Sequence, residues 1–293
     1  MVERILGIIL PVFVVIVVGY LYARRVKPDM AQVNRISMTI LGPALIFSAL
    51  ASKEFDIREN VLLMLGSVGV VLGSGLLAWP VARMMKVDYR TLVPTAMFNN
   101  CGNMGLPLAV LAFGQGGFSA MVALFTISNL LQFTVGVRLI DHHARLGAFL
   151  RNPMLWATVV GFVFAIAHPP MPGWVYFGIK MVGDALIPVM LISLGVRLFE
   201  VRWDDWHIGV IGGIVCPVTG IAMALVLAPM LGLSEMQRGL LILFGSLPPA
   251  VLNFMVAEQM RQEPAKVASI VLIGNVMSVI FVPIGLALAI PSP

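Results

Sequence analysis

The sequence predicts an all-α membrane protein in which ten transmembrane helices form two inverted five-helix repeats. Three observations support this fold class: the composition is too apolar for a soluble chain, apolar runs recur along the whole length, and the two halves match each other. Of the 293 residues, 59% are hydrophobic and 11% are charged, and the mean hydropathy is +0.98. A soluble domain is about half apolar and about a quarter charged, so this chain has too few charges to cover a surface in water.

Apolar runs separated by charged or Pro- and Gly-rich breaks are the candidate spans. A spanning helix needs about 20 apolar residues, so ten of them leave no room for a separate soluble domain. The first run precedes Arg24 and Arg25 and lacks a small-residue cleavage pattern, which indicates a retained helix and not a signal peptide. The expected spans are residues 5–23, 36–51, 61–82, 92–113, 118–139, 153–167, 175–198, 207–230, 238–260 and 267–290.

Basic residues predict the orientation, because the side with more Lys and Arg in its short connections faces the cytoplasm. The odd-numbered spans are followed by Arg24, Arg25, Lys27, Arg35, Arg83, Lys86, Arg90, Arg138, Arg145, Arg151, Arg197, Arg202, Arg261 and Lys266. The opposite side holds fewer: Arg4, Lys53, Arg58, Lys180 and Arg238. The odd-numbered connections are therefore expected in the cytoplasm and both termini outside, in an inner or plasma membrane. The pI near 9.6 reflects this topology and does not indicate nucleic-acid binding.

The two halves match at a shift of 145 to 146 positions. At a shift of 145, Pro43 and Ser48 fall on Pro188 and Ser193. At 146, the matches are Phe98 on Phe244, Asn100 on Ser246, Asn129 on Asn275 and Gln132 on Ser278. Each half has five spans, so the second enters the membrane from the opposite side. The expected units are residues 1–146 and 147–293, and an inverted repeat of this kind is typical of secondary transporters.

The fourth and ninth spans are both interrupted near their middle, at Gly102, Gly105, Pro107, Pro248 and Pro249. Proline suits the first turn of a helix, so we expect new half-helices to begin near Leu106 and Pro249. Two helix N-termini would then meet at the bilayer centre, where their partial positive charge suits an anion. The predicted substrate-binding residues are Asn99, Asn100, Asn103, Ser246 and Asn253. The alternative is that the spans are merely kinked and the asparagines hold neighbouring helices together.

A second polar group could bind a coupling ion, H⁺ or Na⁺; its candidates are Ser128, Asn129, Gln132, Asp184, Asn275 and Ser278. Asp184 lies four residues after Lys180, so a simple surface ion pair is the alternative for it. A carboxylate deep in the membrane would instead indicate a proton or cation site. For the neutral residues the alternative is hydrogen bonding between helices.

Catalytic and metal sites are not predicted. Cys101 and Cys216 lie within apolar runs, which supports neither a disulfide framework nor a cysteine metal site. The histidines, residues 142, 143, 168 and 207, have no carboxylate or cysteine at metal-ligand spacing. No nucleophile with a matching base and no phosphate loop is recognisable, so no cofactor and no enzymatic activity are expected.

At the two breaks the sequence resembles the auxin efflux carrier family, which comprises the plant PIN proteins and their bacterial relatives. The matching residues are Asn100 with Met104–Leu108, and Leu247 and Pro248 with Phe254, Ala257, Glu258 and Pro264. The resemblance implies a fold like that of bile-acid symporters, with helices four and nine crossing as an X. It also implies a scaffold of helices 1, 2, 6 and 7 and a moving transport unit of helices 3–5 and 8–10. Asn100 matches the position at which plant members contact the substrate carboxylate.

The predicted function is elevator-type secondary transport of small organic anions, mono- or dicarboxylates, bound where helices four and nine cross. A sodium-coupled symporter of the bile-acid type is one alternative. A membrane sensor or channel on the same scaffold is another. The expected partners are the anionic substrate and membrane lipids, and a homodimer is left open.

Overall fold

The computed structural model describes residues 2–141, 152–199 and 205–290. Within these ranges the chain is helical and has no strand, which confirms the predicted all-α class. The elements are α1(Val2–Val26), α2(Ala31–Ile36), η1(Ser37–Leu41), α3(Gly42–Leu50), α4(Ile57–Met84), α5(Tyr89–Met97), η2(Cys101–Gly105), α6(Leu106–Leu131), η3(Gln132–Gly136), α7(Val137–Ile140), α8(Pro153–Ala167), α9(Gly173–Asp184), α10(Leu186–Phe199), α11(Trp206–Met230), α12(Glu235–Ser246), α13(Val251–Met260) and α14(Pro264–Ala289). The predicted repeat boundary at 146/147 lies outside the described residues, as do His142, His143, Arg145, Arg151 and Arg202.

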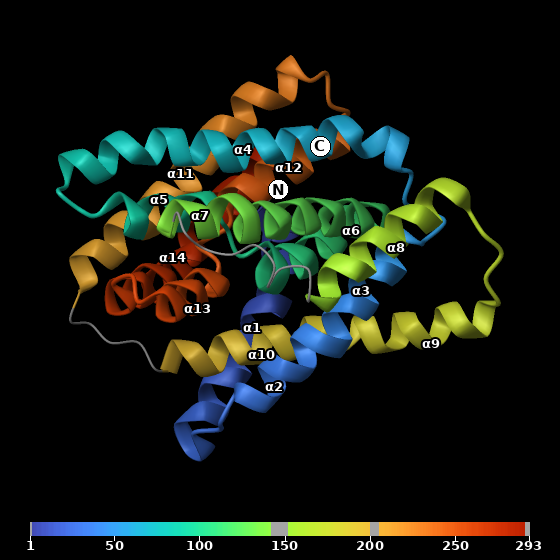
Figure 1. Ribbon diagram of the computed structural model, residues 1–293, viewed down its shortest axis with the longest axis horizontal. Helices are drawn as coiled ribbons and strands as arrows, with labels where there is room; N and C mark the ends of the chain where they lie inside the picture. Colours follow the sequence, from blue (N-terminus) through green and yellow to red (C-terminus); the bar gives the residue numbers. More distant parts are fainter. Residues whose placement is uncertain (1, 142–151, 200–204, 291–293) are drawn as a thin grey trace.

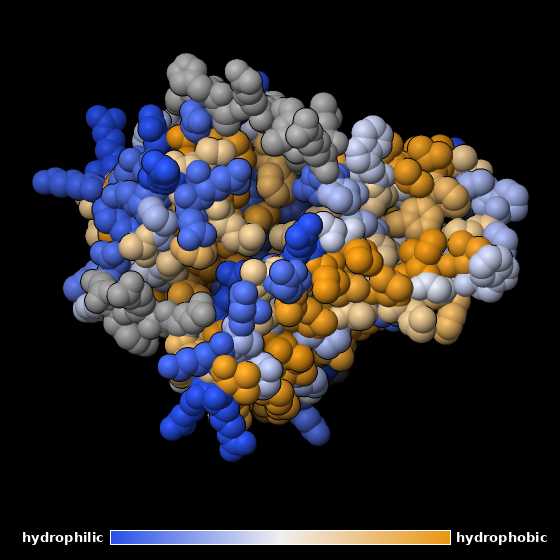
Figure 2. Space-filling model, turned by 60° about the horizontal axis from the view of Figure 1, so that its bottom comes forward, coloured by the Kyte–Doolittle hydropathy of each residue, from blue (hydrophilic) through white to orange (hydrophobic). Residues whose placement is uncertain are grey.

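The described residues include seven helical runs that are long and apolar enough to cross a membrane. They are Val2–Val26, Ala31–Leu50, Ile57–Met84, Cys101–Ile140, Gly173–Phe199, Trp206–Met230 and Pro264–Ala289, and Pro153–Ala167 is a shorter apolar helix. Large apolar side chains such as Leu76, Trp174 and Met230 lie fully on the outside. Figure 2 shows hydrophobic residues exposed over broad areas of one face. A surface of this kind suits lipid, so the chain is a multi-pass membrane protein.

Successive connections lie at opposite ends of the helices. The α3–α4 connection (residues 51–56) and the α8–α9 connection (168–172) lie together at the right of Figure 1. The α4–α5 connection (85–88) lies at the left. We call these the α3–α4 end and the α4–α5 end of the molecule.

Local capping signals explain where several helices begin. The carboxylate of Asp56 accepts a hydrogen bond from the N–H of Arg58 at 2.7 Å, and Asp88 caps α5 in the same way. Asn152 caps α8, and Ser234 forms a capping box with Gln237 at the start of α12. Each of these side chains satisfies a backbone donor that the first helical turn leaves free.

The largest departure from the expected spans concerns the breaks. The fourth span was expected to restart near Leu106, but the π-helical turn η2 already begins at Cys101. A wider π-helical turn relieves the clash between the ring of Pro107 and the carbonyl four residues earlier, so the helix continues through this proline. The ninth span restarts at Val251 and not at Pro249. A residue followed by proline disfavours helical backbone, so Pro248 keeps the chain extended there.

Several pairs of helices approach so closely that only glycine fits between their backbones, and the closest backbone contacts join α1 to α10 and α11 to α12. A Cβ added to Gly195 of α10 would lie 2.0 Å from the carbonyl oxygen of Ile16 in α1. Where α11 meets α12, a Cβ added to Gly220 would lie 2.1 Å from the carbonyl oxygen of Gly245. Small residues allow this close packing in membrane helices, where contact between helices must replace the hydrophobic effect.

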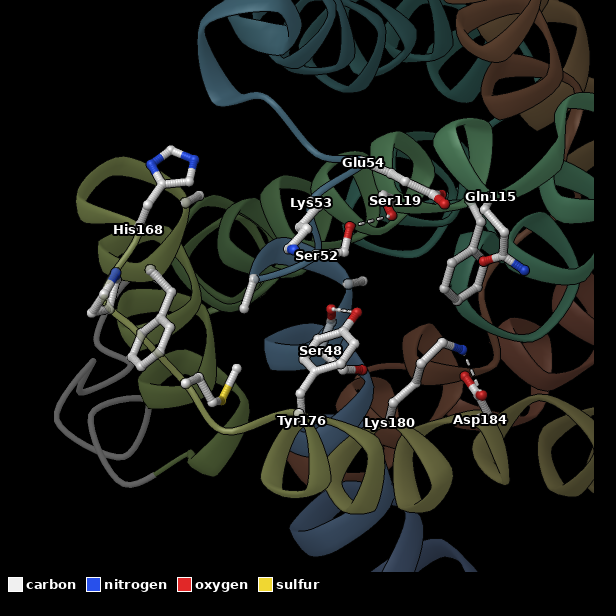
Figure 3. A pocket seen from close by; sticks show the side chains of 18 residues that line it. Ser48, Ser52, Lys53, Glu54, Gln115, Ser119, His168, Tyr176, Lys180 and Asp184 are labelled. Carbon is white, nitrogen blue, oxygen red and sulfur yellow. Dashed lines mark hydrogen bonds and ion pairs between the residues drawn. The ribbon is translucent and has the colours of Figure 1, made fainter.

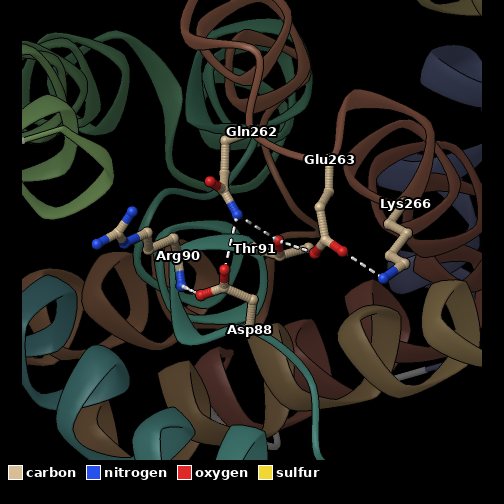
Figure 4. A network of polar contacts seen from close by, with 6 residues as sticks. All are labelled: Asp88, Arg90, Thr91, Gln262, Glu263 and Lys266. Atoms are coloured by element: carbon tan, nitrogen blue, oxygen red, sulfur yellow. Dashed lines mark hydrogen bonds and ion pairs between the residues drawn. The ribbon is translucent and has the colours of Figure 1, made fainter.

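A polar network joins the start of α5 to the turn between α13 and α14 (Figure 4). The hydroxyl of Thr91 donates to the carboxylate of Glu263 at 2.6 Å, and Lys266 pairs with the same carboxylate. The amide of Gln262 donates to the carboxylate of Asp88 at 3.0 Å. The network therefore fastens the first half of one broken span to the second half of the other.

Replacing Lys86 by Gly is expected to stabilise the protein by about 0.5–1 kcal/mol. Lys86 follows α4 with a left-handed backbone (φ 55), which is unfavourable for a residue with a Cβ. Thermal melting in detergent measures the change. Met85→Gly is the matched control, since Met85 has an ordinary backbone (φ −83) and glycine there is expected to lower the melting temperature. Equal shifts in both variants would contradict the prediction.

Candidate functional site

The two breaks cross each other and pair through their backbones. The N–H of Asn100 donates to the carbonyl of Pro248 at 2.7 Å, and the N–H of Ala250 donates to the carbonyl of Phe98 at 2.9 Å. Asn99 and Pro249 thus form an isolated antiparallel bridge. We call residues 98–100 and 248–250 the crossing. Unpaired backbone groups are costly inside a membrane, and here each break supplies the partners that the other lacks.

Asparagine side chains complete the crossing. The amide of Asn99 donates to the carbonyl of Phe244 at 2.5 Å, near the end of α12. The amide of Asn253 donates to the carbonyl of Phe98 at 2.9 Å, just after α5. A carbonyl oxygen can accept two hydrogen bonds, so each asparagine adds a side-chain bond to a carbonyl of the opposite break that already accepts one from the backbone.

A second layer of amides supports the first from η3 and α14. Asn100 donates to the side-chain oxygen of Asn275 at 2.7 Å, and Asn275 donates in turn to the carbonyl of Pro249 at 3.0 Å. Gln132 donates to the side-chain oxygen of Asn253 at 2.8 Å. Both breaks are therefore held in place by residues of the helices behind them, which fixes their geometry.

A cavity of about 80 Å³ opens beside the crossing, bounded on the far side by η1, α8 and α10. We call it the crossing cavity. Seven of the predicted site residues line it: Asn99, Asn100, Gly102, Asn103, Ser128, Asn129 and Gln132. Predicted substrate-binding and coupling residues thus share one small space.

The remaining predicted residues lie elsewhere. Asn253 and Asn275 belong to the supporting network, and Ser246 and Ser278 are buried and donate to carbonyls of their own helices. Gly105, Pro107, Pro248 and Pro249 do not line the cavity and act through the backbone. Asp184 lies in a different cavity, where it pairs with Lys180 at 2.7 Å.

Two helix N-termini contribute to the crossing cavity. Val251 and Leu252 begin α13, and Gly102 and Asn103 belong to η2. Among the described residues no side chain caps either start. Free N–H groups and the partial positive charge of a helix start attract anions, so this arrangement favours a negatively charged ligand.

Sequence reasoning missed a charged residue in the lining, Arg197. It was assigned to the cytoplasmic topology signal, yet it lies in the last turn of α10 and lines the cavity together with Ser193, one turn earlier. This i, i+4 spacing of serine and arginine on an otherwise apolar helix was the available signal. Arginine suits carboxylates because its planar guanidinium can donate two parallel hydrogen bonds.

All three π-helical turns of the described chain also contribute lining residues: Ser37 and Met38 from η1, Gly102 and Asn103 from η2, Gln132 and Phe133 from η3. Such turns concentrate at functional sites, because they redirect side chains and leave backbone groups free. They depend on tertiary packing, so the sequence carried no clear signal for them.

The side-chain oxygen of Asn99 is buried and has no hydrogen-bond partner among the described residues. A buried acceptor without a partner costs about 1–3 kcal/mol. A ligand donor or a bound water is expected to satisfy it. No group of three or more His, Cys, Asp or Glu within the described ranges could hold a metal ion.

Comparison with known proteins identifies the family. A family model described as "Membrane transport protein" matches residues 4–148 and 144–286. The chain is 23% identical over 292 residues to an "Uncharacterized transporter" of Methanothermobacter thermautotrophicus, covering 94% of this chain and 95% of the relative. It is 25% identical over 310 residues to a Rhizobium meliloti protein named "Putative malonate transporter", covering 94% and 93%. These relatives are transporters and not enzymes. The chain belongs to the membrane transport family that includes the auxin efflux carriers.

Proposed function

We propose that the protein is a secondary transporter of small organic anions, mono- or dicarboxylates, which bind in the crossing cavity. One observation carries this proposal: the cavity combines two uncapped helix starts, several asparagines and Arg197, and its described lining contains no Asp or Glu. Two helix starts and a guanidinium give this lining a positive potential, which favours an anion over a cation. The name of the Rhizobium meliloti relative adds support for a short dicarboxylate.

We also propose that ten spans form the inverted repeat expected from the sequence, with elevator-type movement. The predicted scaffold, helices 1, 2, 6 and 7, corresponds to α1, to α2 with α3, to α8, and to α9 with α10. The remaining helices form the predicted transport unit. In support, the crossing cavity lies between these two groups. Its lining on one side comes from η1, α8 and α10, and on the other from η2, α6, η3 and α13. A substrate bound there would touch both a fixed and a moving surface.

For the topology, we propose an inner or plasma membrane with the α3–α4 end and both termini outside. Membrane-impermeant thiol labelling of single introduced cysteines tests this. The natural cysteines, Cys101 and Cys216, are 1% and 2% exposed, so they give little background. A homodimer stays a prediction, and cross-linking in native membranes would test it.

Ligand binding is expected to raise the melting temperature of the purified protein. Malonate at about a hundred times its Kd should add about 2.7 kcal/mol if it binds only the folded form. The matched control is malonamide, which has the same carbon skeleton without charge. A screen of C3 to C6 mono- and dicarboxylates identifies the class. The proposal would be overturned if malonamide stabilised the protein as much as malonate does, or if none of the acids stabilised it.

Replacing Na⁺ by K⁺ on both sides is expected to leave the rate of carboxylate transport unchanged. Hard cations need several oxygen ligands at once. The side-chain oxygens of Asn253 and Asn275 already accept hydrogen bonds from Gln132 and Asn100. Flux into proteoliposomes measures the effect. Loss of flux in K⁺ would favour the sodium symporter, and saturable binding without flux would favour a sensor.

A further inference from the structure

The molecule has a second and larger cavity, of about 650 Å³, at the α3–α4 end. We call it the end cavity. Its walls come from α3 and the α3–α4 connection, from the part of α6 that follows the kink at Gly114, from the end of α8 with the α8–α9 connection, and from α9. It shares no lining residue with the crossing cavity. Nothing in the family assignment or in the crossing accounts for its charged groups.

One face of α9 supplies the polar floor of the end cavity. Tyr176, Lys180 and Asp184 are spaced four residues apart, so they lie in a row along one face of the helix, as Figure 3 shows. The hydroxyl of Tyr176 donates to the carbonyl of Ser48 at 3.1 Å, and Lys180 pairs with Asp184 at 2.7 Å. On the opposite wall, the hydroxyls of Ser52 and Ser119 lie 3.3 Å apart.

The positions that build the two cavities correspond in sequence. At a shift of 146, Asn34 falls on Lys180 and Met38 on Asp184. At a shift of 145, Ser48 falls on Ser193 and Ser52 on Arg197. In each of these four pairs one member lines the crossing cavity and the other lines the end cavity. The same positions of the two halves therefore face the two cavities. Arg197 lines the crossing cavity and Lys180 lines the end cavity, where Lys53, Glu54 and Asp184 are also in the lining.

We propose that the end cavity is a loading site for small carboxylates on the α3–α4 side of the membrane, with Lys180 contacting the anion. This inference rests on the proposed function. Lys180 and Asp184 are 36% and 47% exposed, so their ion pair contributes little stability and Lys180 can exchange Asp184 for a carboxylate in solution. Lysine is a hydrated point charge without the fork of arginine, which suits brief capture more than tight orientation.

Protection of a cysteine tests the loading site. Gln115 is exposed at the rim of the end cavity, so Gln115→Cys is expected to react with an impermeant maleimide. Malonate at about ten times its Kd for this site should slow the reaction about tenfold, and malonamide should not. Adding Lys180→Gln is expected to remove the protection. The matched control is Arg58→Gln, which removes a charge near the same end without lining the cavity.

Asn100→Ala in the same background separates the loading site from the crossing. If the end cavity binds the anion directly, protection persists although transport is lost. Protection that disappears in Asn100→Ala, or that survives Lys180→Gln, would overturn the inference. A third result would also overturn the inference: malonate gives no protection, although its transport depends on Asn100. The proposed function would remain intact in that case. If the wild-type chain transports no carboxylate, the proposed function itself fails.

Discussion

Asn100→Ala is expected to reduce carboxylate uptake at least about a hundredfold, which corresponds to about 2.7 kcal/mol. The variant removes an amide that lines the crossing cavity beside an uncapped helix start. It also leaves the side-chain oxygen of Asn275 without its donor, and this residue positions the second break through Pro249. The proposed site combines amides and helix starts with Arg197, and it depends on the placement of these dipoles, so one lost amide disturbs both binding and geometry.

Counterflow of radiolabelled malonate in proteoliposomes measures the effect, with the melting profile as a check on folding. The matched control is Asn60→Ala. Asn60 is also a buried asparagine, but its amide donates to the carbonyl of Asp56 within the same helix. The control should transport normally. Full transport by Asn100→Ala would remove the crossing from the mechanism.

Gly195→Val is expected to destabilise the protein by more than about 3 kcal/mol, well beyond the usual effect of one substitution. A Cβ at this position would lie 2.0 Å from the carbonyl oxygen of Ile16 and 2.8 Å from the backbone N of Tyr20. Both are backbone atoms, so no side chain can move aside. Helices α1 and α10 would have to move apart, because a close-packed interior has no free space to absorb the clash.

The melting temperature in detergent should fall by about 10 °C. Gly178→Val is the matched control, because a Cβ at Gly178 of α9 meets nothing within 4 Å. Valine also has a slightly better helix propensity than glycine, so the same substitution is expected to cause little or no loss of stability there. Equal losses in the two variants would mean that the close contact of α1 and α10 does not limit stability.

Local signals explain why much of the site was predictable. Asparagine, glycine and proline within an apolar run mark breaks whatever surrounds them, so Asn99, Asn100 and Asn103 were identified and do line one cavity. Arg197 was missed because a basic residue near the end of a span also fits the topology rule. Its position in the lining depends on the approach of α10 to the breaks, which is tertiary information.

The register of the repeat shows a similar limit. The sequence match gives a shift of 146, whereas the helices before the two breaks end at Met97 and Ser246, 149 positions apart. The reason is local: α5 has 9 residues and α12 has 12, although both start at matching positions, Tyr89 and Glu235. Nearly one extra helical turn in α12 displaces the second break. The extra turn consists of Phe244, Gly245 and Ser246, which fall on Phe98, Asn99 and Asn100 at this shift, so a comparison of residue types does not locate it.

The backbone pairing at the crossing also constrains how the protein is made. Residues 98–100 are synthesised about 150 positions before residues 248–250, their hydrogen-bond partners. At about 5–20 residues per second, the first break waits roughly 10–30 s for the second. Unpaired N–H and C=O groups cost several kcal/mol each in lipid, so during this interval the unfinished chain needs water, headgroups or an insertion factor around Phe98 and Asn100. The first half of the protein is therefore an incomplete intermediate of membrane insertion. Its backbone hydrogen bonds at the crossing form only after the second half of the chain has been inserted.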